Sequence, residues 1–277
     1  MNRDVQKLSM ENSQFHVCFS NGDKVKADFV CIACGGYPKS SQFDWIKELG
    51  HTIEDPVPSL FTFNMPGNPI TELMGVVAEN ASVKIIGTKL QEQGPLLITH
   101  WGMSGPVILR LSAWGARELA ARQWKFSVMV NWVAEYNDQS LREKFHELRF
   151  EIASQKINSK NYFGIPARLW EFLLVQSGIK PETRWADLPI KEQNKLIRNL
   201  CQYECSITGK TTFKEEFVTA GGIKLNEVSA DTMMSKKIPN LFFAGEIVDV
   251  DGITGGFNFQ HAWTSGFIAG KTIAGIS

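Results

Sequence analysis

The fold is decided by Leu241-Phe-Phe-Ala-Gly-Glu-Ile-Val-Asp-Val-Asp-Gly-Ile-Thr-Gly-Gly-Phe-Asn-Phe-Gln-His-Ala-Trp-Thr264, near the end of a chain of 277 residues. The short apolar run after Pro239 predicts a buried strand, and the Gly/Asp-rich segment that follows predicts a turn. Beyond the turn, apolar residues recur with helical period. We therefore expect a strand, a loop and the N-terminus of a helix.

This predicted unit has the features of a ligand site. Gly252, Gly255 and Gly256 allow close approach of the backbone, and the first N–H groups of a helix have no intrahelical partner. These N–H groups and the positive end of the helix dipole favour an anion or an electron-rich carbonyl. Asn258 and Gln260 add side-chain amides at the same place. A glycine pair alone is also explained by an α/β connection with a flexible turn.

The predicted helix carries a stripe of small side chains. Ala262, Gly266 and Gly270 follow one another at four-residue spacing, which predicts close packing of this face on a sheet. Polar and charged residues interrupt the segment, and it is too short to span a bilayer, so a membrane helix is disfavoured.

The complete string is more specific than its parts. Its segments Phe-Ala-Gly-Glu246, Asp-Val-Asp-Gly252, Thr-Gly-Gly-Phe-Asn-Phe-Gln260 and Ala-Trp-Thr-Ser-Gly266 closely resemble the C-terminal flavin-binding segment of the BaiN/YhiN-type flavoproteins. These are bacterial FAD-dependent oxidoreductases, also described as aminoacetone-oxidase-like. The resemblance implies that Gly255, Gly256 and the amides after them face the isoalloxazine ring, and that Glu246 lies near the ribityl chain.

A second glycine pair follows another predicted strand. Asp28-Phe-Val-Cys-Ile-Ala-Cys34 runs apolar into Gly35 and Gly36, as a parallel strand buried on both faces would. The end of such a strand is where an open α/β sheet receives a ligand, although a plain glycine turn explains the spacing equally well. The family usually has Ala-Thr-Gly-Gly here, beside the flavin, and Cys34 replaces the threonine.

Two more segments resemble the family. Thr99-His-Trp-Gly-Met-Ser-Gly-Pro106 is similar to its Thr-His-x-Gly-x-Ser-Gly-Pro motif, and Ser104 can cap a helix that Pro106 begins. His100 is either an acid/base group, because histidine titrates near neutrality, or a hydrogen-bonded structural residue; we assign no catalytic acid or base. The resemblance implies that Val218-Thr-Ala-Gly-Gly-Ile223 returns the chain to the flavin ring. A tight turn between strands is the alternative.

Composition limits the class of protein. A hydrophobic content of 43% allows a sizeable core in two or three lobes. Lys plus Arg equal Asp plus Glu at 29 each, so no net charge recruits nucleic acid or an anionic membrane. With no apolar signal region at the start, we expect a cytoplasmic protein whose partner is a small-molecule substrate.

The cysteines do not predict a metal site. Cys31 and Cys34 match a redox or metal half-motif, but residues three apart in a strand point to opposite faces, so we expect buried structural thiols. Cys201 and Cys205 could share a helix face, yet no nearby Cys/His pair completes a zinc site. We therefore expect no metal.

The order of patterns predicts an α/β protein with α+β insertions. Residues 1–55 and 214–277 are expected to form an incomplete, discontinuous Rossmann-like FAD-binding domain, residues 56–137 an antiparallel β lobe and residues 138–213 a helical lobe. Asn21-Gly22 predicts a tight hairpin in the first part. Alternating apolar residues in Trp124–Val133 predict a strand of the β lobe, and apolar spacings of three and four predict helices after residue 138.

One expected feature of the family does not occur. The sequence has no Gly-x-Gly-x-x-Gly loop, which in the family lies near the N-terminus and holds the FAD pyrophosphate. The chain resembles roughly the C-terminal two thirds of the family. Without the central strands on which Val30 and Ile32 should pack, we expect self-association or another chain that supplies the missing part.

Two functional hypotheses remain. The first is an FAD-dependent oxidoreductase fragment that transfers hydride through the flavin to or from a small organic substrate, with NAD(P)H as a candidate co-substrate. The second is a non-catalytic truncated flavoprotein or split subunit that does not bind FAD alone. A methyltransferase is a third idea, which rests only on Ala33–Gly36 after a strand. The expected cofactor contacts are Gly35, Gly36, Gly245, Glu246, Asp251, Gly255, Gly256, Asn258, Phe259 and Gln260.

Overall fold

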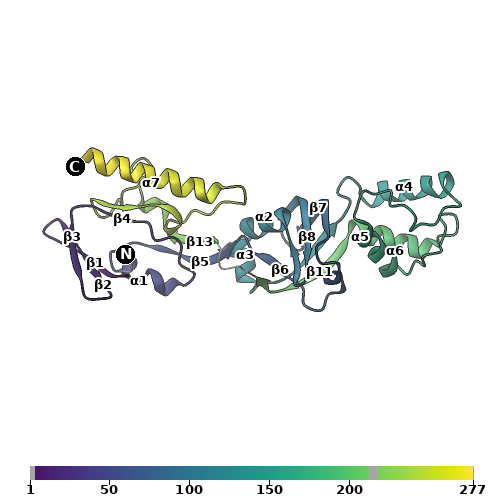
Figure 1. The fold of residues 1–277 in the computed structure, drawn as a ribbon, viewed down its shortest axis with the longest axis horizontal. Coiled ribbons are helices and arrows are strands. Elements are labelled where there is room, and N and C mark those ends of the chain that lie inside the picture. The colour runs from purple at the N-terminus through teal and green to yellow at the C-terminus, as the bar shows by residue number, and fades with distance from the viewer. Residues whose placement is uncertain (1–3, 212–217, 277) are drawn as a thin grey trace. The chain divides into compact units, whose positions relative to one another are not determined.

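The computed structural model describes residues 4–211 and 218–276. It contains two compact units. Unit 1 comprises Met1–Ser59 and Lys214–Ser277, and unit 2 comprises Leu60–Phe213; the colours of Figure 1 follow the residue numbers. Each unit encloses a hydrophobic core of its own. In the described ranges, no helix combines the length and apolar character that crossing a membrane requires.

Unit 1 begins with an antiparallel meander of β1 (Val5–Glu11), β2 (Gln14–Phe19) and β3 (Lys24–Ala27). The β2–β3 hairpin confirms the prediction, and Gly22 takes the positive φ of +87° that the turn requires. The structure adds β1, which joins β2 through Asn12 and Ser13, both also at positive φ. Neither is a glycine, so this first turn lacks the Asn-Gly signal by which the second was predicted.

Two short sheets complete the strands of unit 1. β4 (Val30–Ile32) pairs in parallel with β14 (Leu241–Phe243), and β5 (Ile53–Ser59) pairs antiparallel with β13 (Val218–Ile223). Between β4 and β5 lie η1 (Ser40–Phe43) and α1 (Asp44–Lys47). The two parallel strands place the segments that follow them at one edge.

The glycine pair after Ala220 lies in a strand, so the interpretation of this segment as a tight turn is wrong. Gly221 and Gly222 have φ of +128° and +143° at an irregularity of the β13–β5 pairing. A β-carbon on Gly222 would lie 2.5 Å from the carbonyl oxygen of Ile247. Glycine is needed here because another backbone segment approaches closely.

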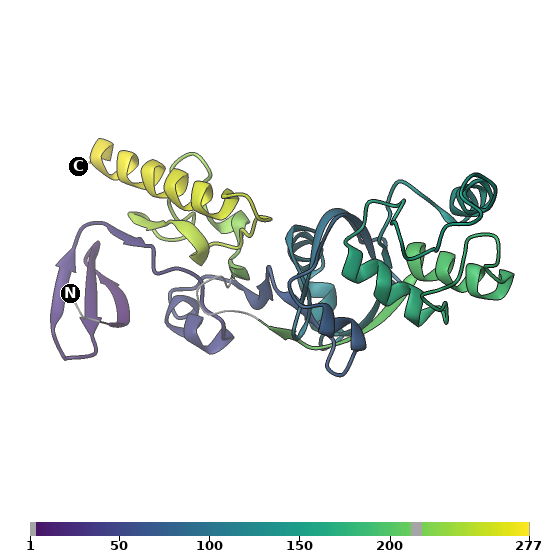
Figure 2. The same ribbon diagram turned by 45° about the vertical axis from the view of Figure 1, so that its right-hand side comes forward.

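The last helix of unit 1, α7 (Phe257–Ile276), packs against η4 (Gly245–Ile247) and β14, and it runs along the short strands in both ribbon views (Figures 1 and 2). Ser265 and Ala269 form the buried centre of this contact. The expected packing of the small-residue stripe is wrong for two of its members. Gly266 and Gly270 are exposed, with open space where a side chain would be.

Unit 2 is built on a seven-stranded antiparallel sheet with the order β11-β10-β7-β8-β9-β6-β12. Its first and last members, β11 (Tyr203–Thr208) and β12 (Lys210–Thr211), are consecutive in the chain and separated only by Gly209. β11 pairs with β10 while β12 pairs with β6, so the sheet closes on itself as a barrel. The other strands are β6 (Thr62–Asn64), β7 (Val77–Ile85), β8 (Gln91–Thr99), β9 (Gly102–Ser104) and β10 (Lys125–Asn131).

The expected antiparallel β lobe is confirmed by this sheet. In β10, Phe126, Val128 and Val130 are buried, as their alternation predicted. The prediction of a helical lobe over residues 138–213 is wrong at its end. Residues 203–208 and 210–211 form strands β11 and β12 of the same sheet.

Five helices accompany the barrel in the described part of unit 2: α2 (Pro106–Trp114), α3 (Ala116–Ala121), α4 (Asp138–Glu151), α5 (Ala167–Gln176) and α6 (Ile190–Cys201). Pro166 and Pro189 are the N-caps of α5 and α6. The predicted cap of α2 is wrong: Ser104 ends β9, and the N-cap is Gly105 at φ +92°. A β-carbon at Gly105 would lie 2.9 Å from backbone atoms of β8, which excludes a serine there.

Candidate functional site

The segments after the two parallel strands meet at Glu246. Its carboxylate accepts the backbone N–H of Gly36, after β4, at 3.3 Å. It also accepts the N–H of Thr219, in β13, at 2.7 Å. A β-carbon on Gly36 would lie 2.9 Å from this carboxyl group. One side chain therefore holds three segments of unit 1 together at the carboxyl end of the parallel pair.

The N-terminal part of α7 joins the same edge. The N–H of Gly245 donates to Ser265 Oγ at 2.9 Å. The side-chain amide of Asn258 accepts the N–H of Gly252 at 2.7 Å and donates to the carbonyl of Gly252 at 3.0 Å. These bonds close the Gly/Asp-rich loop over the start of the helix. The strand–loop–helix unit that the sequence predicted is therefore present.

Backbone donors remain available at the start of α7. The first i→i−4 hydrogen bond of the helix is donated by the N–H of Gln260 to the carbonyl of Gly256 at 2.8 Å. Within residues 4–211 and 218–276, the N–H groups of Phe257, Asn258 and Phe259 have no such acceptor. Gly256 has a φ of +86° and open space where its side chain would lie. The loop can thus admit an electron-rich group close to these donors.

The other residues predicted to contact the cofactor either bond within unit 1 or lie beside open space or a neighbouring ring. Asp251 accepts a hydrogen bond from Ser59, at the end of β5, at 3.0 Å. Gln260 donates to Thr264 one turn along α7 at 2.9 Å. Gly35 has a φ of +79° and open space beside it, and a β-carbon on Gly255 would lie 3.3 Å from the ring of Phe257. The polar side chains therefore brace the loops, and the backbone carries the free donors.

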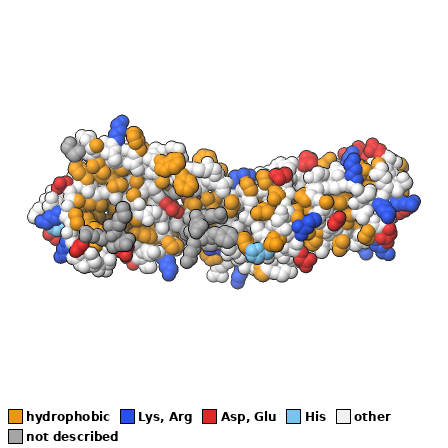
Figure 3. Space-filling model, viewed as in Figure 1, with side chains coloured by type: hydrophobic (Ala, Val, Ile, Leu, Met, Phe, Trp, Pro, Cys, Tyr) orange, Lys and Arg blue, Asp and Glu red, His pale blue; other side chains and the backbone are white. Residues whose placement is uncertain are grey.

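A row of exposed aromatic side chains follows α7. Phe259, Trp263 and Phe267 are each 69–70% exposed, and the first two rings stack at 6.2 Å. In the space-filling view, hydrophobic side chains gather over the part of unit 1 that contains α7 (Figure 3). We call these three residues the α7 aromatic row. The spacing of four between these aromatic residues is visible in the sequence. Because we expected the helix to be packed, the sequence did not lead us to predict that they are exposed.

The exposure of side chains corrects one further prediction and bears on His100, whose role the sequence left open. Cys31 and Cys34 are exposed, not buried, and both line one groove beside β4. The neighbouring strands that would bury them are not part of the described fold. In unit 2, His100 is exposed, with its ring edge-on to Trp101 at a centroid distance of 4.1 Å. Among the residues that the structure describes, no carboxylate hydrogen bonds to His100, so its geometry adds nothing to the acid/base interpretation.

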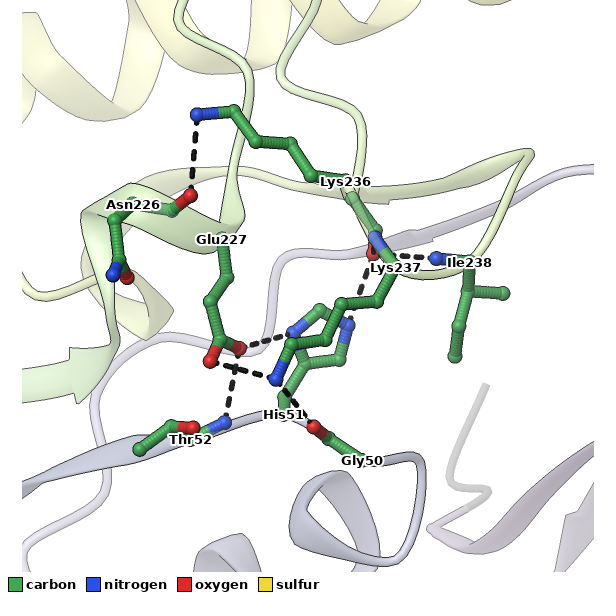
Figure 4. Close-up of polar contacts among 9 residues, drawn as sticks. Gly50, His51, Thr52, Asn226, Glu227, Lys236, Lys237 and Ile238 are labelled. Atoms are coloured by element: carbon green, nitrogen blue, oxygen red, sulfur yellow. Dashed lines mark hydrogen bonds and ion pairs between the residues drawn. The ribbon is translucent and has the colours of Figure 1, made fainter.

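Sequence analysis missed a buried polar cluster in unit 1, shown in Figure 4. His51 Nδ1 lies 2.9 Å from the Glu227 carboxylate, and His51 Nε2 lies 3.1 Å from Ser235 Oγ. The Glu227 carboxylate also accepts from Lys237 Nζ at 2.7 Å and from the N–H of Thr52 at 2.9 Å. We call these residues the His51 cluster. Its members are up to 186 positions apart, so no local pattern reveals it.

The order Ser–His–Glu in this cluster is that of a hydrolytic triad, but the surroundings exclude the activity. Ser235 is only 3% exposed, so no substrate reaches its oxygen. Ser235 Oγ already accepts the N–H groups of Lys237 and Ile238 at 3.0 and 2.9 Å. Its hydrogen is therefore directed to His51 Nε2. The His51 cluster is a structural clasp between the start of β5 and the segment before β14.

Comparison with known proteins gives one family match and several similar relatives. The family model described as the HI0933-like protein barrel and H2TH domain matches residues 57–218, more than half of the chain. A 3-dehydro-bile acid delta(4,6)-reductase of Clostridium scindens is 28% identical over 98% of the chain. Ribosomal RNA dihydrouridine synthases of Escherichia coli and Haemophilus influenzae are 30% and 27% identical over 91% and 82% of it.

The relatives are longer than the matched chain, which covers 68%, 62% and 54% of their respective lengths. The matched family model begins in β5 and ends in β13, so it spans the closed barrel and its helices. The resemblance found in the Gly/Asp-rich loop lies outside that range, in unit 1, and agrees with it. From the barrel match and these relatives, the chain belongs to the HI0933-like family of BaiN/YhiN-type flavoprotein oxidoreductases.

Proposed function

We propose that this chain forms the flavin-ring side of an FAD-dependent reductase that adds hydride to a carbon–carbon double bond conjugated to a carbonyl. The observation that carries the proposal is the meeting of Gly36, Glu246 and the first half of α7, at Ser265, at one edge. Open α/β sheets bind ligands at the carboxyl ends of their strands.

The names of the relatives support the choice of reaction. A delta(4,6)-reductase reduces carbon–carbon double bonds, and dihydrouridine is uridine with one such bond reduced. In a 3-oxo steroid and in uracil, the reduced bond is conjugated to a carbonyl. The substrates differ greatly in shape, so the shared element is the electron-poor double bond. We therefore propose a substrate of this chemical class, and leave its remaining structure undefined.

The residues present fit an isoalloxazine ring. The free N–H groups of Phe257, Asn258 and Phe259 are suited to the carbonyl edge of the ring, where negative charge collects on reduction. Gly35 and Gly256 leave open space for a planar group. Gly245, Glu246 and Asn258 hold the loops that carry these donors. When bound, FAD supplies hydride transfer from a reduced nicotinamide to the substrate.

Two variants test this assignment. Gly256→Ala should weaken FAD binding about tenfold, because the new methyl group occupies the proposed cofactor space. Gly50→Ala is the matched control: Gly50 has φ +87°, against +86° at Gly256, and equally open surroundings. Both variants should lose similar stability. FAD is added to each purified protein, the unbound fraction is removed, and the retained flavin absorbance is titrated.

The outcome also decides the alternative function. Equal retention in both variants would remove the α7 loop from the cofactor site. If the unaltered chain retains no FAD, the second hypothesis holds: a split subunit that binds the cofactor only together with another polypeptide.

A further inference from the structure

The positive charge of the chain is concentrated in one part of unit 2. Lys plus Arg equal Asp plus Glu over the whole chain, but unit 2 contains 18 Lys and Arg against 14 Asp and Glu. Residues 153–198 contain eight of these cations and four of these anions, so this stretch accounts for the whole excess of four. All eight cationic residues are exposed. The neutral overall balance therefore conceals a basic surface.

Four of these cations lie on two loops that are hydrogen bonded to each other. We call them the loop cations: Lys156, Lys160, Lys180 and Arg184. The first two belong to the loop between α4 and α5, and the others to the loop between α5 and α6. The N–H of Ile157 donates to the carbonyl of Thr183 at 2.9 Å, and the N–H of Trp185 donates to the carbonyl of Gln155 at 3.0 Å. Ile157 and Trp185 are fully buried, so the core fixes the position of both loops.

Within this pairing, Lys156 and Arg184 lie directly opposite each other as an antiparallel bridge. The two hydrogen bonds are made by the residues on either side, so this is a non-hydrogen-bonded pair, whose α-carbons are typically about 4.5 Å apart. Like charges directly opposite in such a pair are destabilising. Among the residues that the structure describes, neither Lys156 nor Arg184 has an ion pair. An anion bound between these two side chains would therefore be stabilising.

The other charged groups of the two loops leave this surface positive. Lys160 Nζ lies 5.0 Å from the centre of the Tyr162 ring, and the Tyr162 hydroxyl is itself hydrogen bonded within the loop. The second loop contains two exposed carboxylates, Glu182 and Asp187, whereas the first loop contains none. Four cations thus face two anions, and the first loop is purely cationic.

The composition of the loops favours a phosphate backbone over a protein partner. Phosphate oxygens of nucleic acids are bound by Lys and Arg together with Ser, Thr and Asn, and Ser154, Asn158 and Thr183 accompany the loop cations. Protein interfaces instead have an apolar centre from which charged residues are depleted. Neither loop, both within the described range 4–211, contains an exposed large hydrophobic side chain.

We propose that the loop cations bind the phosphate backbone of an RNA, with one phosphate between Lys156 and Arg184. The choice of RNA rests on the proposed function, because uracil, a base of RNA, contains the electron-poor double bond assigned to the substrate. The affinity for phosphate comes from the two loops alone. Phosphate contacts orient a nucleic acid without reading its sequence, so the loop cations position the RNA and take no part in the reduction.

A paired neutralisation isolates the site. Lys156→Gln combined with Arg184→Gln removes both opposed charges and keeps the backbone bridge. Lys191→Gln combined with Lys195→Gln is the matched control, because these α6 residues are also exposed and the net charge changes equally. The probe is a fluorescent single-stranded RNA of about 20 nucleotides that contains uridine, longer than a typical single binding site. Fluorescence anisotropy follows its binding to each full chain at several salt concentrations.

The unaltered chain and the control should bind the RNA alike, and the paired variant should bind it about tenfold more weakly. For the paired variant, the slope of log K against log salt concentration should be smaller by about 1.4, as loss of two phosphate contacts predicts. Without RNA, the paired variant should melt no lower than the unaltered chain, since it lacks the repulsion. Equal weakening by both pairs, no binding by the unaltered chain, or tighter binding of DNA of the same sequence would overturn the proposal.

Competition separates RNA from other anionic partners. Unlabelled RNA should displace the probe, whereas polyglutamate of equal total charge and inorganic phosphate of equal phosphate content should not. Displacement by polyglutamate would overturn the proposal in favour of an acidic protein. None of these measurements requires FAD. A chain that retains FAD but does not bind RNA would overturn this inference alone, and the converse result would overturn the proposed function alone.

Discussion

Single residues in the His51 cluster hold distant parts of unit 1 together. Ser235 Oγ accepts two backbone N–H groups and donates to His51; the bond to His51 is buried and the other two are partly buried. Removing the oxygen leaves the N–H groups of Lys237 and Ile238 without this acceptor. Loss of an acceptor for a buried donor costs more than the hydrogen bond itself contributes. The cluster is therefore a place where one atom has a large effect.

Ser235→Ala should lower the free energy of unfolding by about 2 kcal/mol, because it leaves two partly buried N–H donors unsatisfied and removes the buried hydrogen bond to His51. Ser20→Ala is the control: Ser20 is exposed, and its change should cost less than about 0.5 kcal/mol. Urea denaturation followed by circular dichroism measures both. Equal midpoints for the two variants would contradict the structural role of Ser235.

The same cluster should make unit 1 sensitive to acid. Burial lowers the pKa of His51, and this outweighs the opposite effect of Glu227. The unfolded chain therefore binds the proton more readily, so stability should fall as the pH drops below about 6.5. Burial alone would raise the pKa of Glu227, but hydrogen bonds from Lys237, Thr52 and His51 lower it to about 2. Its contribution is present above the ordinary pKa of 4.5 and is lost towards pH 2.

Urea unfolding at pH 8, 7, 6 and 5 should give a steadily lower midpoint for the chain. His51→Gln should be less stable at pH 8 but should lose less between pH 8 and 5, since it cannot take up the proton. A pH dependence identical to that of the unaltered chain would exclude His51 as the titrating group.

At the scale of elements, the β13–β5 pairing depends on the absence of a side chain. Gly222→Ala should destabilise unit 1 by about 3 kcal/mol, because the β-carbon would lie 2.5 Å from a backbone oxygen at a φ of +143°. Gly266→Ala, on the exposed side of α7, should stabilise by roughly 0.5–1 kcal/mol through helix propensity. Thermal unfolding of both variants checks the opposite signs. A harmless Gly222→Ala would refute the close approach.

Elements with a repeating pattern could be predicted from the sequence, whereas their neighbours could not. The alternation in β10 and the apolar spacings of three and four in α4 to α6 are local signals, and the structure confirms them. The exposure of Cys31 depends on which strand lies beside β4, and the cap at Gly105 depends on the approach of β8. Such features follow from tertiary contacts that the local sequence does not encode.

The candidate site likewise has features that the local sequence predicts and features that depend on tertiary contacts. The Gly/Asp-rich loop and the helix after it were located by their glycines, and the loop is closed by Asn258. The role of Glu246 as a bridge to Gly36 and Thr219 required three segments from opposite ends of the chain. The sequence thus indicated which residues lie at the edge, but it did not indicate which of their atoms stay free.

At the scale of the whole molecule, the two units have separate cores. Residues 60–213 form one continuous stretch that contains the closed barrel, its helices and the larger core. Expressed alone, this stretch should fold and should melt cooperatively within a few degrees of the corresponding transition of the full chain. Differential scanning calorimetry measures both transitions. A non-cooperative melt of the isolated stretch would show that unit 2 requires unit 1.

The strand that closes the barrel sets an order of assembly. β12 completes the ring by pairing with β6, and Asn64 bonds to Thr211 across 147 positions. On the ribosome, the early strands emerge long before the one that seals them, and the helices α4 to α6 are made in between. Closing so long a loop is entropically slow. During synthesis, the sheet therefore stays open, with two unpaired edge strands, until β12 is made. At this stage a chaperone would have most exposed strand edge to protect.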